Sequence, residues 1–325
     1  MKRRELLVAI AGGLILEPAP GSAQQSGRVP VVGMLITHPP VTDPVVEALR
    51  TGLRQYGYED GRNIRLEVRT ASGQLDRVPA LAEELVRLGV DVIVLANEPA
   101  LRAVTKATRT IPVVMAGYTD DPAAIGWIDS FRRPGGNITG VFTVNAALVS
   151  KHLELLKETL PGVSRVAVFW DPVFGRRQLD EVQRVSPQLG LKCEPIEVRS
   201  LRDIAPAFDT AKRVRAGAIL MVWTPLLYVH RERVGALALK MKLPIVTDMS
   251  DLAEAGALLS YGSLGNASFE RAGYYVDRLL KGAKASELPV EQMSNIKLLV
   301  NTKTAKALGI TIPQSILVRA DEVIR

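Results

Sequence analysis

The feature that most constrains the fold is a turn-rich stretch near the middle of the chain, residues 132–141 with the sequence RRPGGNITGV. Its proline, glycines and asparagine favour turns and positive φ, and the residues ITGVF at its end favour a β-strand. Strand-like and helix-like runs alternate before this stretch, and the same alternation begins again after it. We therefore interpret it as a crossover between two α/β lobes, and small ligands tend to bind between lobes.

The first half of the chain has the pattern of a doubly wound sheet. Apolar runs rich in β-branched residues predict buried strands at 30–36, 91–95 and 111–115, and residues 63–69 alternate as in a strand with one solvated face. Apolar residues at helical spacing predict helices at 45–56 and 75–88. The strand–helix alternation predicts a mainly parallel sheet with helices on both faces.

The second half repeats this alternation. The expected strands are 165–170, 191–198, 217–223, 243–247 and 257–261, and the expected helices are 148–160, 174–189, 201–215 and 226–241. A helix at 268–281, a strand at 296–300 and a helix at 302–308 come too late to begin a third domain. We expect them to return to the lobes, giving lobe 1 as 28–143 with 264–292 and lobe 2 as 144–263 with 293–325. Several crossings would then form a multi-strand hinge about which the lobes open and close.

The amino terminus has the organisation of a secretory signal peptide, expected to span residues 1–23. A basic start, MKRR, precedes a short apolar region at 6–16 and small residues at 21–23. The motif RRELL resembles a twin-arginine signal but lacks the usual Phe, so both the Sec and the twin-arginine routes stay open. The mature protein is expected to be periplasmic.

The charge pattern argues against nucleic acid as a partner. The net charge is +7, and removing Lys2, Arg3, Arg4, Glu5 and Glu17 with the signal peptide leaves +6. The basic residues are scattered among acidic ones, and no nucleic-acid-binding module is evident. The single cysteine, Cys193, excludes an intramolecular disulfide and is interpreted as a small buried residue.

Candidate binding residues follow the strands, because ligands of open α/β sheets bind outside the carboxyl ends of the strands. The aromatic residues would form a wall, and Glu98, Asp120, Asp171 or Asp248 would hold an ammonium group. Helix amino termini and threonine hydroxyls would hold a carboxylate. The alternative, helix capping by Asp and Thr and core packing by Trp, stays open. The candidates are Thr37, Asn97, Glu98, Tyr118, Thr119, Trp170, Asp171, Trp223, Thr224, Asp248 and Tyr261.

Motifs of enzymes and metal sites are not found in the sequence. His38, His152 and His230 are far apart and have no metal-ligand spacing, and the last two are expected on helix surfaces. The glycines at 135–140 lack the spacing of a dinucleotide-binding loop, and no nucleophile elbow or Walker loop occurs. We therefore expect no catalytic residue, no metal and no cofactor.

Five segments, in conserved order along the chain, resemble a family of ABC-transporter substrate-binding proteins: 53–64 (LRQYGYEDGRNI), 133–140 (RPGGNITG), 288–292 (LPVEQ), 301–309 (NTKTAKALG) and the closing 312–324. The resemblance implies a type I periplasmic-binding-protein fold with a small-molecule ligand, an amino acid or related solute, between two lobes. It implies delivery to ABC permease subunits in the inner membrane by a monomer without a cofactor. One departure is Asn97-Glu98, where many relatives have small or hydroxyl residues.

Two other functions remain open at this point. The protein is alternatively a sensor subunit that presents its ligand to a membrane receptor. The less favoured alternative is an extracytoplasmic enzyme, which would require Glu98, Asp120 and Asp171 to converge with raised pKa values.

Overall fold

The computed structural model describes residues 28–37, 44–263 and 266–325. The predicted signal peptide and His38 lie outside these residues.

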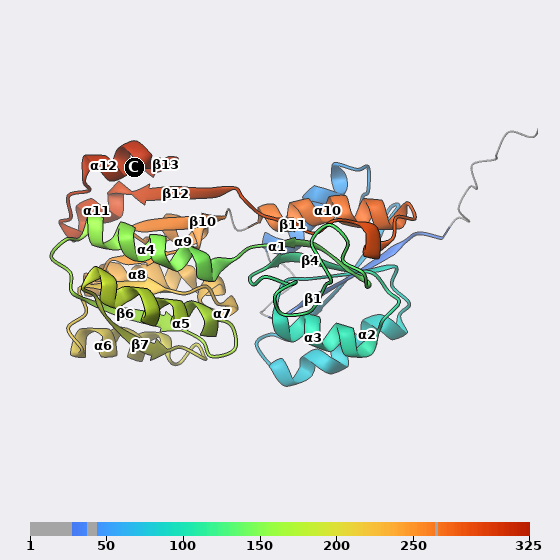
Figure 1. Ribbon diagram of the computed structural model, residues 1–325, viewed down its shortest axis with the longest axis horizontal. Coiled ribbons are helices and arrows are strands. Elements are labelled where there is room, and N and C mark those ends of the chain that lie inside the picture. Colours follow the sequence, from blue (N-terminus) through green and yellow to red (C-terminus); the bar gives the residue numbers. More distant parts are fainter. Residues whose placement is uncertain (1–27, 38–43, 264–265) are drawn as a thin grey trace, which may run out of the picture.

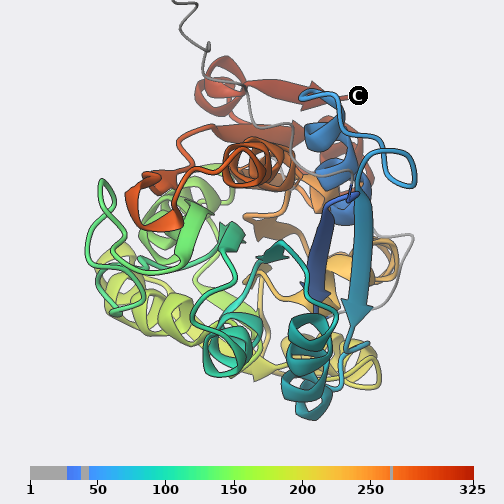
Figure 2. The same ribbon diagram turned by 90° about the vertical axis from the view of Figure 1, so that its right-hand side faces the viewer.

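Lobe 1 is built on a six-stranded parallel sheet with the order β11-β5-β4-β3-β1-β2. Its strands are β1 (Val31–Ile36), β2 (Arg65–Thr70), β3 (Val92–Leu95), β4 (Val113–Tyr118), β5 (Ile138–Phe142) and β11 (Glu291–Gln292). The buried clusters place α1 (Pro44–Arg54) and α10 (Ala267–Leu280) on one face, and α2 (Val78–Arg87) and α3 (Glu98–Ala107) on the other (Figures 1 and 2). Both faces of the sheet are covered, which explains why β1 and β3 are apolar throughout.

Lobe 2 has a seven-stranded sheet with the order β13-β12-β10-β9-β8-β6-β7, parallel except for the antiparallel pair β10–β12. Its strands are β6 (Arg165–Trp170), β7 (Lys192–Glu197), β8 (Ala218–Met221), β9 (Ile245–Thr247), β10 (Leu259–Ser263), β12 (Ile296–Asn301) and β13 (Glu322–Ile324).

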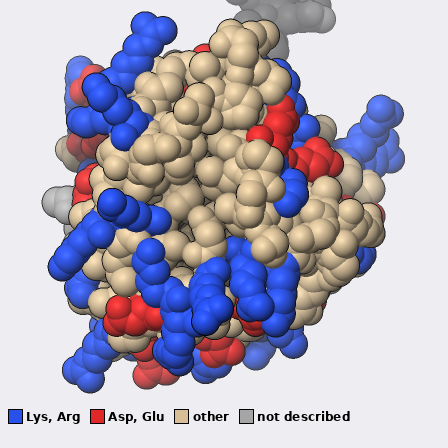
Figure 3. Space-filling view, turned by 90° about the vertical axis from the view of Figure 1, so that its left-hand side faces the viewer, with Lys and Arg blue, Asp and Glu red and all other residues tan. Residues whose placement is uncertain are grey.

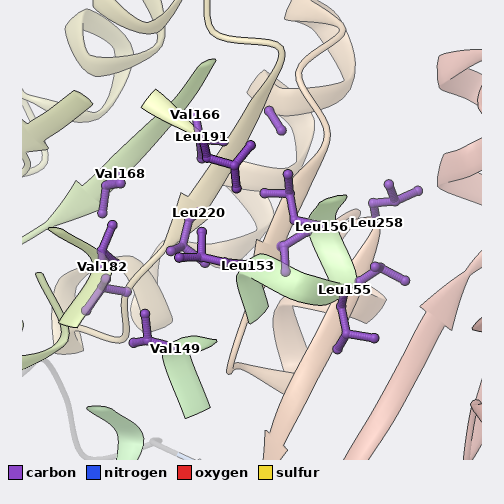
Figure 4. Close-up of a cluster of buried hydrophobic side chains, with 14 of the residues drawn as sticks. Val149, Leu153, Leu155, Leu156, Val166, Val168, Val182, Leu191, Leu220 and Leu258 are labelled. Carbon is purple, nitrogen blue, oxygen red and sulfur yellow. The ribbon is translucent and has the colours of Figure 1, made fainter. Parts of the chain in front are cut away.

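Helices cover both faces of this second sheet as well. One face carries α4 (Asn145–Thr159), α5 (Arg176–Val185), α11 (Thr302–Leu308) and α12 (Gln314–Arg319), packed through the cluster shown in Figure 4. The other carries α6 (Ile204–Arg213), α7 (Pro225–Val229), α8 (Arg231–Met241) and α9 (Ser250–Glu254). Single 3₁₀ turns lie at Leu75–Arg77, Ser186–Leu189 and Ala285–Glu287.

The two lobes repeat one topology. The orders β2-β1-β3-β4-β5 and β7-β6-β8-β9-β10 are the same doubly wound arrangement. The winding reverses between β1 and β3 and between β6 and β8, the position where such sheets bind ligands. The chain passes between the lobes three times, from β5 to α4, from β10 to α10 and from β11 to β12 (Figure 1). The expectation of two doubly wound lobes with a multi-strand hinge is confirmed.

Helices α1 and α10 of lobe 1 approach each other through glycines. A Cβ added at Gly52 would lie 2.1 Å from the carbonyl oxygen of Glu270, and one at Gly273 would lie 2.4 Å from the carbonyl carbon of Gly52. The two helices therefore pack backbone to backbone at this point. The position of α10 matters for the site because its first turn lies at the interlobe cavity described below.

Two expectations about local structure are wrong. The helix expected at 226–241 is two helices, α7 and α8, because the backbone at His230 leaves the helical region (φ −100°, ψ 21°). His152 is buried rather than at the surface, and its Nε2 donates a hydrogen bond to the carbonyl oxygen of Tyr261 (2.6 Å). Burial lowers the pKa of His152 to about 4, so its ring is neutral at physiological pH.

No helix in the described part of the chain combines the length and the apolar character needed to cross a bilayer.

Candidate ligand-binding site between the lobes

A cavity lies between the two lobes, with an empty volume of about 800 Å³ that is partly open to solvent. Its walls come from the carboxyl ends of strands in both sheets, from the first turns of α9 and α10 and from the crossover between β5 and α4. The lining residues are Val45, Ala96, Asn97, Ala116, Gly117, Thr119, Thr143, Asn145, Trp223, Tyr228, Asp248, Met249, Ser250, Asp251, Ser263, Ser268 and Phe269.

Asp248 is the most strongly perturbed group of this cavity. It follows β9, and its Oδ2 accepts a hydrogen bond from the Nδ2 of Asn145 (2.9 Å), the first residue after the crossover. Its Oδ1 is buried and has no hydrogen-bond partner among the described residues. Burial raises the pKa of Asp248 to about 7. A buried carboxylate oxygen without a donor is an acceptor available to a ligand.

The electrostatics of the cavity favour a positive charge near Asp248. Two carboxylates, Asp248 and Asp251, line it, and no Lys or Arg is among its described lining residues. Polar donors lie on the opposite wall, where Ser268 sits in the first turn of the 14-residue helix α10. The amino terminus of such a helix favours a negative group.

Gly117 allows the close approach of this helix to β4. Its φ is +86°, and an added Cβ would lie 2.6 Å from the Oγ of Ser268. A side chain at this position would therefore be strained in its backbone and would displace Ser268.

The remaining wall is aromatic and apolar. Trp223, Tyr228, Met249 and Phe269 line the cavity, and Trp223 is held edge-to-face by Phe174 with ring centroids 6.4 Å apart. A flat apolar ligand group has a surface to lie against here.

Four of the residues predicted from the sequence line this cavity: Asn97, Thr119, Trp223 and Asp248. Asn97 also has a structural role, since its Oδ1 accepts from the Ala100 amide (3.2 Å) and caps α3. Its Nδ2 donates to the Oγ1 of Thr37 (2.9 Å). Thr37 is buried behind the wall and positions Asn97 instead of lining the cavity.

Glu98 and Tyr118 were expected at the ligand, but the structure places both outside the cavity. The Glu98 carboxylate accepts hydrogen bonds from Arg102, from the Tyr118 hydroxyl and from the Trp127 Nε1 (3.0 Å). Burial and the Glu98 carboxylate raise the pKa of Tyr118. Glu98 instead lines a second hollow with Trp127 and with Arg177 of lobe 2. Glu98 is the first residue of α3 and adjoins Asn97, but the two side chains have different hydrogen-bond partners.

Four further candidates of lobe 2 are also outside the cavity. Trp170 is buried in the hydrophobic cluster between the lobe 2 sheet and the helices α4 and α5, and Asp171 accepts from the Val173 amide (2.7 Å). Thr224 caps α7 by accepting from the Leu227 amide (3.1 Å), and Tyr261 packs against His152. These four residues have the local hydrogen-bonding and packing roles that the sequence analysis gave as the alternative to ligand binding.

The three carboxylates of the enzyme alternative do not meet at one place, because Asp171 lies apart from Asp120 and Glu98. Asp120 lies near Arg177 (3.6 Å) and Glu98, whereas the charges around Asp171 are Arg199 and Glu197. Across the described ranges, no group of three or more His, Cys, Asp or Glu is arranged to hold a metal ion.

Sequence reasoning missed the contributions of the crossovers and of helix first turns. Thr143 and Asn145 flank the first crossover, and Ser268 and Phe269 begin the returning helix. The predicted crossover could have identified the residues that flank it, because hinge segments border the space between two lobes. The start of α9 was also missed, because this five-residue helix has no clear periodic pattern in the sequence.

Comparison with known proteins assigns the family. The family model described as ABC transporter substrate binding protein matches residues 29–324. The chain belongs to the ABC transporter substrate-binding protein family. This member is 25% identical to a tyrosine-binding protein of Clostridioides difficile (strain R20291) over 286 residues, which cover 85% of this chain and 79% of the relative.

Two solved structures resemble this substrate-binding protein closely in fold. A Streptococcus pneumonia ABC domain in complex with L-Trp is 27% identical with a TM-score of 0.80, covering 91% of this chain and 100% of that one. A conserved domain protein from Vibrio cholerae is 26% identical with a TM-score of 0.82 at the same coverage. The expected type I periplasmic-binding-protein fold is thereby confirmed, and the protein is a substrate-binding component of an ABC transporter.

Proposed function

We propose that this substrate-binding protein captures an α-amino acid or a related solute with an ammonium group in the interlobe cavity and delivers it to ABC permease subunits in the inner membrane. The observation that carries the proposal is the buried Oδ1 of Asp248, which has no hydrogen-bond partner among the described residues, in a cavity whose described lining contains no basic residue. An unpaired buried carboxylate oxygen is costly unless a donor arrives, and an ammonium group is the strongest such donor.

The cavity suggests an orientation for such a ligand. The ammonium group lies on Asp248, and the carboxylate lies toward Ser268 and the amino terminus of α10. The side chain then lies against Trp223 and Phe269. The relatives named for tyrosine and solved with L-Trp make the aromatic amino acids the first candidates to test.

Ligand capture is proposed to act through lobe closure. In this proposal, residues 28–143 and 264–292 form one moving unit, and residues 144–263 and 293–325 form the other. The protein acts as a monomer in the periplasm. A ligand that contacts both walls binds the closed form more tightly than the open form and so shifts the population toward closure.

The test is titration calorimetry with L-Trp, L-Tyr and L-Phe, and with two analogues of L-Phe. The analogue without the ammonium group, 3-phenylpropionate, is expected to show no binding, whereas phenethylamine, without the carboxylate, retains part of the affinity. Asp248→Asn is expected to lower amino-acid affinity about 100-fold, because a charge-assisted hydrogen bond in a buried site is lost.

The matched control is Asp180→Asn, which removes an exposed acid on α5 that pairs with Arg176 (3.7 Å). This variant should bind as the wild type does. Equal affinity of the wild type and Asp248→Asn, or tight binding of 3-phenylpropionate, would contradict the proposed recognition.

A further inference from the structure

The end of lobe 2 opposite the cavity carries a row of cations. The cavity lies at the carboxyl ends of the strands, so this row lies at their amino-terminal ends. Lys192 and Arg165 begin the adjacent strands β7 and β6 and are paired in register, and Arg215 and Lys242 precede the next two strands, β8 and β9. Neighbouring strands are about 4.8 Å apart, so the four cations form a line across the sheet edge.

Three more cations join the row from the helices. Lys212 and Arg213 lie in the last turn of α6 and Lys240 lies in the last turn of α8, and these helix ends lead into β8 and β9. Figure 3 shows this face of the molecule, with basic side chains gathered across its lower part. We call the set the basic edge; all of its members are exposed: Arg165, Lys192, Lys212, Arg213, Arg215, Lys240 and Lys242.

Most members of the basic edge form no ion pair among the described residues. Within the described ranges, Lys192 is the one member that forms an ion pair, with Glu194 at 2.9 Å. Many arginines elsewhere have an acidic partner, such as Arg69 with Glu84 and Arg271 with Glu291. Uncompensated cations on one face produce a local positive potential that attracts an anionic surface.

The backbone at two members is unusual for residues with side chains. Arg215 (φ +58°) and Lys242 (φ +52°) adopt the left-handed conformation after a helix, where glycine is favoured. The chain uses glycine in this conformation at Gly190 and Gly309. A favourable interaction with the helix dipole explains why basic residues occur in the last turns of helices. It does not explain Arg165 and Lys192, which begin strands.

We propose that the basic edge binds the anionic phospholipid headgroups of the membrane surface at which the transporter works. A bilayer surface requires only a spread of positive charge and no shaped pocket. Four cations aligned across the ends of adjacent strands provide such a spread. Because the basic edge and the cavity are at opposite ends of the lobe 2 strands, this contact leaves the cavity unobstructed and is independent of the ligand.

The test is co-sedimentation of the purified protein with vesicles of phosphatidylcholine alone and of phosphatidylcholine mixed with phosphatidylglycerol. The wild type is expected to bind the mixed vesicles in low salt, to dissociate as salt is raised, and to ignore the neutral vesicles. Every variant keeps the same amino terminus as the wild type, so a contribution of residues 1–27 cancels in the comparison.

Two double variants test the basic edge itself. Arg215→Glu with Lys242→Glu reverses two charges, and Arg215→Gly with Lys242→Gly removes them while suiting the left-handed backbone, so the second variant folds even if the first does not. Each is expected to weaken binding to the mixed vesicles at least about tenfold.

The matched control is Arg109→Glu with Arg133→Glu, two exposed cations of lobe 1, which should leave vesicle binding within about twofold of the wild type. No binding of the wild type to mixed vesicles, or an equal loss in the control, overturns the proposal. Binding to an acidic protein but not to mixed vesicles overturns it as well.

Discussion

At the scale of single residues, the chemistry of the site is concentrated in Asp248. Its buried Oδ1 has no hydrogen-bond partner among the described residues, and burial raises its pKa to about 7, compared with about 3.9 for an unfolded Asp. In the ligand-free protein the protonated form of Asp248 therefore predominates only below about pH 7. The contribution of Asp248 to the free energy of unfolding therefore decreases as pH rises from about 4 to 7, because the folded protein binds the proton more tightly.

Ligand affinity is expected to have the opposite pH dependence. An ammonium group needs the ionised carboxylate, so amino-acid affinity should weaken about tenfold for each pH unit below 7. Calorimetry between pH 5.5 and 8 measures this, and near pH 7 the heat should depend on the buffer because binding releases a proton. In Asp248→Asn the pH dependence should disappear. A wild-type affinity that does not change across this range would argue against Asp248 as the ammonium partner.

Trp223 should report ligand binding, and Trp170 should not. Trp223 lines the cavity, whereas Trp170 is buried in the core of lobe 2. Titration of the wild type with L-Tyr or L-Phe is expected to change its tryptophan fluorescence, and Trp223→Phe should remove most of the change. The matched variant Trp170→Phe should keep it. A change of equal size in both variants would mean that Trp127 or a global rearrangement is being observed.

At the scale of secondary-structure elements, the site depends on where α10 sits. The first turn of this helix supplies Ser268 and Phe269 to the cavity, and its middle packs on α1 through Gly52 and Gly273. The distance between α10 and α1 is thus set by two glycines that do not line the cavity.

Gly52→Ala is expected to destabilise the protein by about 2–3 kcal/mol, because the new Cβ would meet the Glu270 carbonyl oxygen at 2.1 Å and force the helices apart. Thermal or denaturant unfolding measures the loss, and amino-acid affinity should fall with it as α10 moves. The control is Gly136→Ala, where an added Cβ meets nothing within 4 Å. Equal stability of both variants would show that α1 and α10 can separate without penalty.

The sequence predicts the strands and the edge of the sheet at which the site lies, but it does not settle which side chains line the cavity. Asp248 and Trp223 were identified because they follow strands. Glu98 was misassigned because adjacency to Asn97 does not determine where the first side chain of a helix leaves the sheet edge. Ser268 was missed because its place at the cavity depends on the return of α10 to lobe 1, a long-range contact that no local pattern encodes.

At the scale of the whole molecule, a side-chain ion pair joins the two lobes outside the hinge. It lies between Asp120, after β4 of lobe 1, and Arg177 on α5 of lobe 2 (3.6 Å). Burial raises the pKa of Asp120, and the Arg177 guanidinium opposes that increase. This contact exists only while the lobes are close together.

Arg177→Ala is expected to speed ligand dissociation roughly two- to fivefold, because a half-exposed ion pair contributes up to about 1 kcal/mol to the closed form. Stopped-flow displacement measures the rate. Arg176→Ala is the matched control, since Arg176 pairs with Asp180 within α5. If both variants release the ligand at the wild-type rate, the Asp120–Arg177 pair has no part in holding the lobes together.

The three passages of the chain between the lobes also determine the order in which the protein is completed during synthesis. Lobe 1 lacks α10 and β11 until residue 292 has been synthesised, and the lobe 2 sheet lacks β12 and β13 until Ile324 has been synthesised. A nascent chain of 263 residues therefore lacks α10, which together with α1 covers the face of the first sheet that carries Val32 and Met34. Neither lobe is therefore formed from one continuous run of the chain, and lobe 1 is still incomplete when β6 to β10 of lobe 2 have already been synthesised.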